Sequence, residues 1–169
     1  MADLNLEPPE YKSYYHSPIG LVEVIGTENS LKSIYFVDEK PSEFESNPYL
    51  KKAAKQIEEY FTGQRKDFSL NYKFEGTDFQ KSVWEYLLKI PYGETVSYFD
   101  VASALNNQDS IRAVGSANGK NKLSIVVPCH RVIGSDGKLT GYAGGLWRKQ
   151  WLLSHEFNHS EHKIQMELF

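Results

Sequence analysis

The sequence has one cysteine in 169 residues, and this scarcity excludes two common ways of stabilising a small protein. A single thiol forms no intramolecular disulfide and no zinc site that needs several cysteines. The chain also has no apolar run of the roughly 18 residues that a membrane helix needs. Its first residues, MADLNLEPPEYKSYY, lack the basic and apolar segments of a secretory signal. We therefore expect a cytoplasmic protein, or a nuclear one in a eukaryote, where a free thiol stays reduced.

Acidic residues outnumber basic ones, but the two signs are unevenly distributed along the chain. The formal net charge is −3, with +6 between positions 112 and 149 and −9 in the remainder. The basic residues of that span are Arg112, Lys120, Lys122, Arg131, Lys138, Arg148 and Lys149. This asymmetry indicates a basic face on an acidic body, which would attract a phosphate backbone. A solvated lysine-rich surface is the alternative.

Residues 1–75 have the pattern of a small α+β domain. The segments GLVEVIGT and LKSIYFVD flank the turn TENS, as in a β-hairpin. Asn47 and Pro48 then begin YLKKAAKQIEEYFTG, whose apolar residues recur at helical spacing before a glycine. These residues contain no recognisable catalytic constellation.

Residues 76–158 have a helical pattern and are predicted to form a second domain. In GTDFQKSVWEYLLKIPYG, Thr77 and Gln80 form a capping box that predicts a helix of about 13 residues. Ser97 and Asp100 repeat this spacing at the start of a shorter helix.

A further short helix follows the polar segment NNQD. Ser110 is expected to cap it, with Ile111, Val114 and Ala117 facing inward and Gly119 at its end. Two short helices joined by a polar turn favour a helix-turn-helix, although hairpins of this length also occur as plain packing units.

The last predicted helix lies in LWRKQWLLSHEF, after the glycine-rich loop GSDGKLTGYAGG. Leu146, Gln150 and Leu153 are expected on one side of it, with Trp147 and Trp151 as an i,i+4 pair. Residues 159–169 are expected to form a loosely ordered tail.

The single cysteine stands in SIVVPCHRVIG, residues 124–134. A lone cysteine is often a small buried hydrophobe, but His130 and Arg131 are poorly suited to a dry core. A thiol with an ordinary pKa of about 8.5 needs a nearby base or positive field to act as a nucleophile at neutral pH. His130 could supply the base, directly or through a water, if an acidic residue held its tautomer. A hydrogen-bonded structural histidine is the alternative.

Taken together, these motifs closely resemble the O6-alkylguanine-DNA alkyltransferases. PCHRVIG is followed by GYAGG and LLSHE and preceded by IPYGETVSY and RAVGSANGKN, in that family's order across residues 77–156. Before residue 76 the similarity is one of general layout. The resemblance implies an α+β protein, in which a small N-terminal β-rich, ribonuclease H-like domain precedes a helical, winged helix-turn-helix-like alkyltransferase domain.

The resemblance implies five catalytic positions. Cys129 matches the residue that accepts the alkyl group and keeps it as a thioether. His130 matches the histidine that acts on the thiol through a water, and Glu156 the carboxylate that orients it. Asn121 matches an asparagine that ties this network to the backbone, and Tyr98 a tyrosine that donates to the base.

The resemblance also implies a DNA-binding surface and a substrate pocket. The helix that carries Arg112 is expected to enter the minor groove, where this side chain would fill the gap left by an extruded nucleotide. The expected DNA-binding residues are Arg112, Ala113, Gly115, Ser116, Tyr98 and Arg131. The expected pocket residues are Tyr142, Ala143, Gly144, Val132 and Ser124.

The implied activity is DNA repair by stoichiometric, irreversible transfer of a methyl or larger alkyl group from O6-alkylguanine to Cys129, with O4-alkylthymine left open as a substrate. We expect no cofactor, because the chain has no cofactor motif. The expected partner is double-stranded DNA of almost any sequence. We expect the protein to bind it as a monomer and to have no membrane partner.

Some relatives bind a structural zinc through N-terminal cysteines and histidines. That half of this chain has only His16 and no cysteine, so we predict no metal.

Departures from the family pattern concern the pocket wall. Many relatives have prolines in the loop where this chain has NKLSI, so Lys122 and Ser124 predict a more open and more polar wall. Ala143 stands where some relatives have serine, which predicts the loss of one possible donor near O6. Three other functions stay open. An alkyltransferase-like protein would flag damage without repairing it, but it carries tryptophan in place of the cysteine. A cysteine hydrolase would need an oxyanion hole, and a regulatory helix-turn-helix protein would show sequence preference and usually dimerise.

Overall fold

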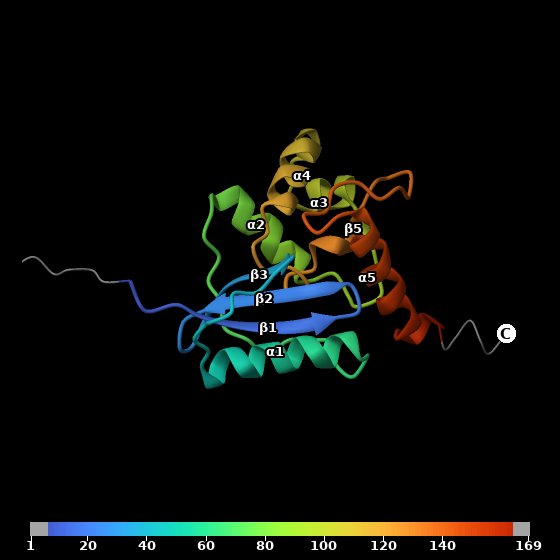
Figure 1. Ribbon diagram of the computed structural model, residues 1–169. Coiled ribbons are helices and arrows are strands. Elements are labelled where there is room, and N and C mark those ends of the chain that lie inside the picture. Colours follow the sequence, from blue (N-terminus) through green and yellow to red (C-terminus); the bar gives the residue numbers. More distant parts are fainter. Residues whose placement is uncertain (1–6, 164–169) are drawn as a thin grey trace, which may run out of the picture.

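The computed structural model describes residues 7–163, and its elements form a small antiparallel sheet followed by a set of helices (Figure 1). The strands are β1 (Tyr11–Ser17), β2 (Gly20–Gly26), β3 (Leu31–Val37), β4 (Val96–Ser97) and β5 (Val132–Ile133). The helices are α1 (Pro48–Phe61), α2 (Asp78–Leu87), α3 (Tyr98–Ala104), α4 (Ile111–Gly119) and α5 (Leu146–Asn158), with 3₁₀ turns η1 (Gln108–Ser110) and η2 (Cys129–Arg131).

The N-terminal sheet has the order β1-β2-β3, and α1 covers one of its faces (Figure 1). The predicted hairpin is confirmed as β2 and β3, to which β1 adds a third strand. The predicted start of α1 is also confirmed: the Asn47 side chain accepts from the Leu50 amide at 2.8 Å, and Pro48 occupies the first turn. Fully buried Leu50 and Ile57 then place one stripe of α1 in the core.

Both predicted capping boxes are present in the helical half. Thr77 and Gln80 cap α2 reciprocally, and Ser97 and Asp100 cap α3 in the same way. The helix α2 has 10 residues, fewer than expected. Its Trp84 is buried and donates to the Ala117 carbonyl of α4 at 2.8 Å, which joins the two helices.

The start of α4 differs from the prediction. Ser110 makes no capping hydrogen bond to this helix; its hydroxyl donates to the Asn107 carbonyl at 2.6 Å and closes η1. Ile111 is 41% exposed, so it does not face inward, whereas Val114 and Ala117 are buried as expected. The predicted apolar face is therefore correct only from Val114 onward.

The side of α5 that carries Leu146, Gln150 and Leu153 is not its buried side. Leu146 and Trp147 are exposed, and the ring of Trp151 contacts Phe61 and His155. Among the described residues no ring contact joins Trp147 to Trp151, because the Arg148 guanidinium lies over Trp147 instead. The buried residues of α5 are Lys149, Leu152, His155 and Glu156.

The segment that leads to the cysteine extends the edge of the N-terminal sheet. On β3, the Ile34 amide donates to the Lys122 carbonyl at 2.8 Å, and the Ser124 amide donates back to the Ile34 carbonyl at 3.3 Å. Arg148 makes a second link between the halves by donating to the Ile19 carbonyl at 2.7 Å. The small parallel pair β4–β5 holds the other end of the cysteine segment, because β5 directly follows η2 and pairs with β4 at the start of α3.

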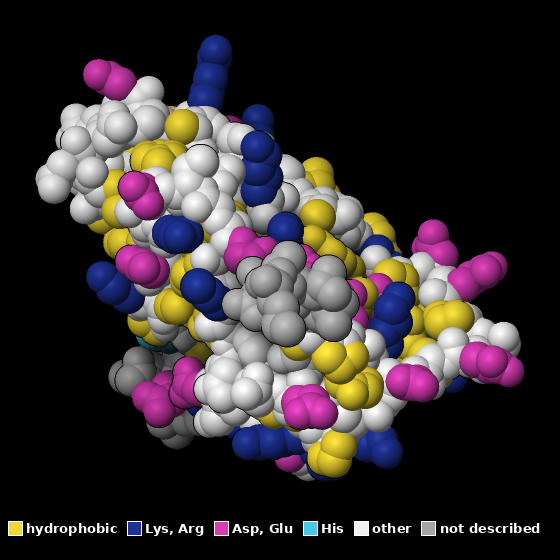
Figure 2. Space-filling view, turned by 90° about the vertical axis from the view of Figure 1, so that its left-hand side faces the viewer, with side chains coloured by type: hydrophobic (Ala, Val, Ile, Leu, Met, Phe, Trp, Pro, Cys, Tyr) yellow, Lys and Arg dark blue, Asp and Glu magenta, His cyan; other side chains and the backbone are white. Residues whose placement is uncertain are grey.

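The basic surface expected from positions 112–149 is smaller than the residue count implied, because Arg131 and Lys149 are buried. On the face shown in Figure 2, acidic and basic side chains are interspersed. Within residues 7–163 no helix is long and apolar enough to cross a membrane. The expected loose tail is wrong for its described part, since Ser160 is buried and residues 161–163 are helical, and residues 164–169 lie outside the described part of the chain.

Candidate active site

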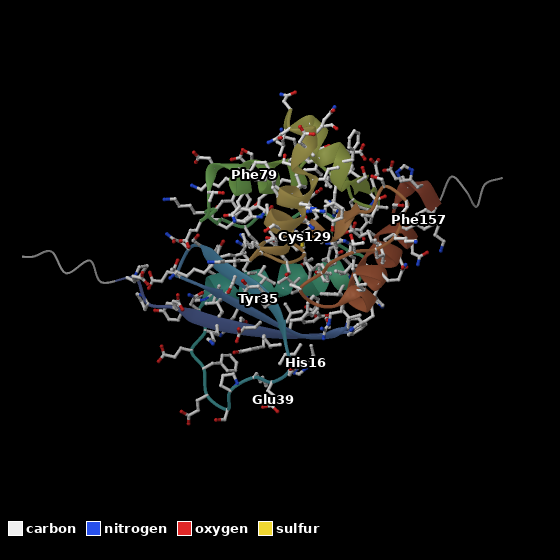
Figure 3. The ribbon with its side chains drawn as sticks, turned by 90° about the horizontal axis from the view of Figure 1, so that it is seen from above. His16, Tyr35, Glu39, Phe79, Cys129 and Phe157 are labelled. Atoms are coloured by element: carbon white, nitrogen blue, oxygen red, sulfur yellow. The ribbon has the colours of Figure 1, made fainter. Side chains whose placement is uncertain are left out.

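Cys129 lies near the centre of the molecule, at the start of η2 (Figure 3). The preceding backbone is sharply folded: Ile125 has φ +72°, a strained value for a β-branched residue. Asn121 secures this segment, because its amide donates to the Val127 carbonyl at 2.8 Å and its oxygen accepts from the Leu123 amide at 2.9 Å. Asn121 thus ties this segment to its own backbone, and its role in the catalytic network stays a prediction.

The Cys129 thiol is 5% exposed. Burial raises its pKa, while a hydrogen bond from Asn121 and the charge of Lys149 act in the opposite direction. The thiol is therefore protonated at neutral pH in the resting site, and nucleophilic chemistry needs a base that removes the proton.

His130 is the nearest candidate base, and it is fully buried. Its Nε2 lies 2.7 Å from Oε1 of Glu156, and its Nδ1 has no hydrogen-bond partner among the described residues. Burial lowers the pKa of His130 despite the neighbouring carboxylate, so the ring is neutral at pH 7. We assign the proton to Nε2, where it is donated to Glu156, which leaves the Nδ1 lone pair free.

Arg131 pairs with the same carboxylate. Its Nε and Nη2 donate to the two oxygens of Glu156 at 2.8 and 2.9 Å, and its Nη1 donates to the Ile90 carbonyl at 2.7 Å. Burial alone would raise the pKa of Glu156, but His130 and Arg131 hold it well below its usual value. The expectation that Arg131 contacts DNA is therefore wrong, since its side chain is only 8% exposed and its guanidinium is fully hydrogen-bonded within the protein. The expectation that His130 and Arg131 are poorly suited to a dry core is also wrong, because the buried Glu156 carboxylate pairs with both of them.

Lys149 is a site residue that sequence analysis missed. It is fully buried, and its Nζ donates to the Thr140 and Gly141 carbonyls at 3.1 and 3.3 Å and lies 3.5 Å from the Tyr98 hydroxyl. Burial lowers its pKa to about 8, although the Cys129 thiolate would raise it. The run WRKQW contains no signal that distinguishes this lysine from a surface one.

Two further residues were missed because their sequence contexts are ordinary. Tyr60 lies in the apolar stripe of α1, yet its hydroxyl donates to Glu156 at 2.8 Å. Asn118 lies on α4, and its amide donates to the Cys129 carbonyl at 3.2 Å.

The expected pocket residues lie in different environments. Val132 and Ser124 are buried, and the Tyr142 hydroxyl is buried with no partner among the described residues. Ala143 is exposed. A Cβ on Gly144 would lie 3.0 Å from the Phe36 and Tyr142 rings, so a larger residue would require these rings to shift by a few tenths of an ångström.

Two tyrosines lie within electrostatic range of the thiol. Burial raises the pKa of Tyr98 and of Tyr142, and a Cys129 thiolate would raise both further. In the resting arrangement the Tyr98 hydroxyl donates to the Thr140 carbonyl at 2.9 Å.

The helix α4 presents the expected DNA-binding residues on its outer side. Arg112, Ala113 and Ser116 are exposed. A Cβ on Gly115 would meet only the Tyr98 ring at 3.9 Å, and one on Gly119 would meet nothing within 4 Å. Packing within the protein therefore does not require glycine at either position.

Among residues 7–163 no group of three or more His, Cys, Asp or Glu side chains is arranged to hold a metal ion. His16, the histidine considered for zinc, lies at the margin of the molecule (Figure 3). The prediction that the protein binds no metal stays a prediction.

Comparison with known proteins identifies the class as one that joins a ribonuclease-like domain to a DNA-binding domain. Residues 11–74 match the family model described as 6-O-methylguanine DNA methyltransferase, ribonuclease-like domain. Residues 78–158 match the model described as 6-O-methylguanine DNA methyltransferase, DNA binding domain. The chain belongs to the 6-O-methylguanine DNA methyltransferase family, which confirms the resemblance and the α+β fold predicted from the sequence.

Individual relatives are similar over nearly the whole chain. The methylated-DNA–protein-cysteine methyltransferase of Methanosarcina barkeri is 47% identical over 154 residues, which cover 88% of this chain and 98% of the relative. That of Mycolicibacterium paratuberculosis is 46% identical over 156 residues, with coverages of 89% and 94%. The crystal structure of Mycobacterium tuberculosis O6-methylguanine methyltransferase superposes with a TM-score of 0.80 at 40% identity, covering 90% of this chain and 95% of that one. The M. tuberculosis OGT in complex with DNA gives a TM-score of 0.78 at 40% identity, with coverages of 87% and 92%.

Proposed function

We propose that this protein repairs DNA by direct reversal, taking a methyl or larger alkyl group from guanine O6 in duplex DNA onto Cys129. One observation carries the proposal: the single cysteine adjoins a buried histidine that is paired with an ionised carboxylate. Family membership supports it, because similar relatives are named methylated-DNA–protein-cysteine methyltransferases.

The reaction exchanges one carbon–oxygen bond for a carbon–sulfur bond and moves one proton. The Cys129 sulfur attacks the alkyl carbon, and a sulfur–carbon bond forms as the carbon–O6 bond breaks. The thiol proton passes to Nδ1 of His130, directly or through a water, and ends on the departing guanine. The electron pair of the broken bond moves to O6 and the purine ring, where donation by Tyr98 would stabilise the charge.

The buried ions prepare the base and the nucleophile. Glu156 fixes the proton on Nε2 of His130 and would stabilise the imidazolium that forms when Nδ1 takes the thiol proton. Arg131 keeps Glu156 ionised. Lys149 lowers the cost of a Cys129 thiolate through its positive charge.

The protein cannot regenerate its thiol by this chemistry. A thioether has no leaving path at neutral pH, so each molecule acts once. We propose that no cofactor takes part, and that the protein works in the cytoplasm, or in the nucleus of a eukaryote.

The exposed side of α4 supports a minor-groove interface. Removing a nucleotide from the stack costs a few kcal/mol, and an inserted Arg112 would recover part of that cost. Gly115 and Ser116 would let the backbone approach DNA closely. Readout in the minor groove is degenerate, which suits a monomer that repairs lesions in almost any sequence.

The family matches also support the proposed division of the chain. They end at residue 74 and resume at residue 78, which brackets a boundary between domains 1–75 and 76–158. Residues 159–169 would form a tail.

Intact-protein mass spectrometry after incubation with duplex DNA containing O6-methylguanine tests the proposal. We expect the mass of one methyl group on Cys129, none in Cys129→Ala, and no second transfer when DNA is in excess. Repeated turnover would refute single use and favour a hydrolase-like cycle. Binding with an unchanged mass would refute alkyl transfer and favour a damage-flagging protein. Duplexes with larger O6-alkyl groups and with O4-methylthymine then define the substrate range.

A further inference from the structure

Glu156 is the point where the two halves of the chain meet in the active site. Its fully buried carboxylate accepts hydrogen bonds from His130, Arg131, the Gly93 amide and Tyr60. The first three donors belong to the helical half. Tyr60 comes from α1, 96 residues away in sequence and on the far side of the small sheet (Figure 1).

The Tyr60 side chain is held so that its hydroxyl has one target. The residue is fully buried, and its ring contacts four aromatic neighbours: Phe61, Phe68, Tyr92 and His155. Burial first, and then the charge of Glu156, raise the pKa of Tyr60 well above its ordinary value. The hydroxyl therefore stays protonated and donates to Glu156.

Tyr60 and His130 share one oxygen of the carboxylate. Both lie within hydrogen-bond distance of Oε1, at 2.8 and 2.7 Å. An oxygen that accepts an additional hydrogen bond holds its negative charge more firmly and attracts an imidazolium less. Without the Tyr60 hydroxyl, more of the charge would face His130 and favour its protonated form, which has no free Nδ1 lone pair.

We propose that Tyr60 is a positioning residue through which the N-terminal half keeps His130 neutral and its Nδ1 available to the Cys129 proton. The inference rests on the proposed function of Cys129. It gives the N-terminal half a part in the chemistry, exerted through Glu156 without contact with DNA or the alkyl group.

Other ionisable groups around the pair set the background against which Tyr60 acts. Arg131 and Lys149 lower the pKa of His130 by their charge, after the larger effect of burial, and Glu156 raises it. The groups that act on the pair are Arg131 of η2, Lys149 and His155 of α5, Tyr142 before α5, Tyr92 before β4, and Tyr60 of α1.

The test compares Tyr60→Phe with the matched control Tyr92→Phe. The Tyr92 ring lies 6.1 Å from that of Tyr60, and its hydroxyl is equally buried but has no hydrogen-bond partner among the described residues. Single-turnover methyl transfer is measured against pH for both variants. We expect the acid limb of the Tyr60→Phe profile to move to higher pH by about half a unit or more, with the Tyr92→Phe profile unchanged.

A second measurement separates this inference from the proposed function. The ¹⁵N NMR shifts of the His130 ring report its tautomer and protonation without DNA, and we expect Tyr60→Phe to protonate it at a higher pH than the wild type. If the wild type accepts no methyl group, the proposed function fails while the NMR titration still decides the role of Tyr60.

A third form of the protein keeps the inference testable if Tyr60→Phe does not fold. Incorporating 3-fluorotyrosine at position 60 keeps the ring and strengthens the donor, so the His130 titration is expected to move to lower pH. The inference is overturned if neither change at position 60 moves the titration, or if Tyr92→Phe moves it equally.

Discussion

Replacing Lys149 with methionine tests how much a buried cation costs in folding stability and how much it contributes to the reaction at Cys129. Burial lowers the pKa of Lys149 from 10.5 to about 8. A difference of this size makes the folded ammonium about 3 kcal/mol less favourable than the same group in water. The wild type carries this cost at neutral pH, whereas methionine of similar length does not.

The sign of the pH dependence follows from this lowered pKa. Between about pH 8 and 10.5 the folded protein binds fewer protons at Lys149 than the unfolded chain, so wild-type stability rises with pH in this window. Lys149→Met lacks that rise. From pH 7 to pH 10 the free energy of unfolding of the wild type should therefore gain about 2 to 3 kcal/mol relative to the variant.

Urea unfolding of both proteins at the two pH values measures this gain. Loss of the hydrogen bonds from Lys149 to the Thr140 and Gly141 carbonyls destabilises the variant at both pH values, so the comparison between the two pH values isolates the charge. Lys138→Met is the control, because the Lys138 side chain is 81% exposed and its charge stays hydrated. A stability difference between wild type and Lys149→Met that is the same at pH 7 and pH 10 would refute the reasoning. We also expect Lys149→Met to slow methyl transfer at pH 7 by about tenfold, since the thiolate loses the positive charge of Lys149.

Three further variants probe the remaining parts of the site. Glu156→Gln leaves the Arg131 charge buried without its partner and should destabilise the fold by about 3 to 5 kcal/mol. Folding lowers the pKa of Glu156, so the stability that its charge gives the wild type is lost at low pH. In urea unfolding, the difference in stability between wild type and variant should therefore shrink as the pH falls below about 4. Arg112→Ala should slow single-turnover repair of duplex DNA by about 10- to 100-fold, which corresponds to the loss of one stacking contact. A free O6-alkylguanine base needs no extrusion and should react with this variant at the wild-type rate. Gly115→Ala should raise the free energy of unfolding by up to about 1 kcal/mol, because the new methyl group meets only the Tyr98 ring at 3.9 Å. The same variant should bind duplex DNA more weakly in a fluorescence titration. Unchanged binding would show that DNA does not approach this part of α4. Metal analysis of the purified protein should find none, and one equivalent of zinc would contradict the prediction drawn from the scarcity of cysteine and histidine.

Local signals in the sequence predicted the local structure well. The capping boxes at Thr77 and Ser97 and the proline start of α1 depend on hydrogen bonds within a few residues, and all three are present. Ser110 shows the limit of such signals, because a competing bond to the Asn107 carbonyl used the same hydroxyl.

The buried side of α5 could not be predicted because this helix violates the usual division between apolar and charged residues. Its inward side carries Lys149, His155 and Glu156, while Leu146 and Trp147 face outward. A periodicity argument assigns charged residues to the surface unless it knows their partners. Those partners, such as Tyr60 and Arg131, are remote in sequence and meet only in the folded chain.

The main-chain hydrogen bonds between Ile34 and residues 122–124 also protect an edge of the N-terminal sheet. β3 is an edge strand of the three-stranded sheet, and such an edge exposes unpaired amides and carbonyls that can recruit a strand from another molecule. Here the segment leading to Cys129 occupies part of that edge, and a bridge from Leu31 to Tyr72 occupies another part. A variant or an adduct that loosens the segment would uncover the edge, so its first symptom in concentrated solution should be aggregation, before any loss of secondary structure.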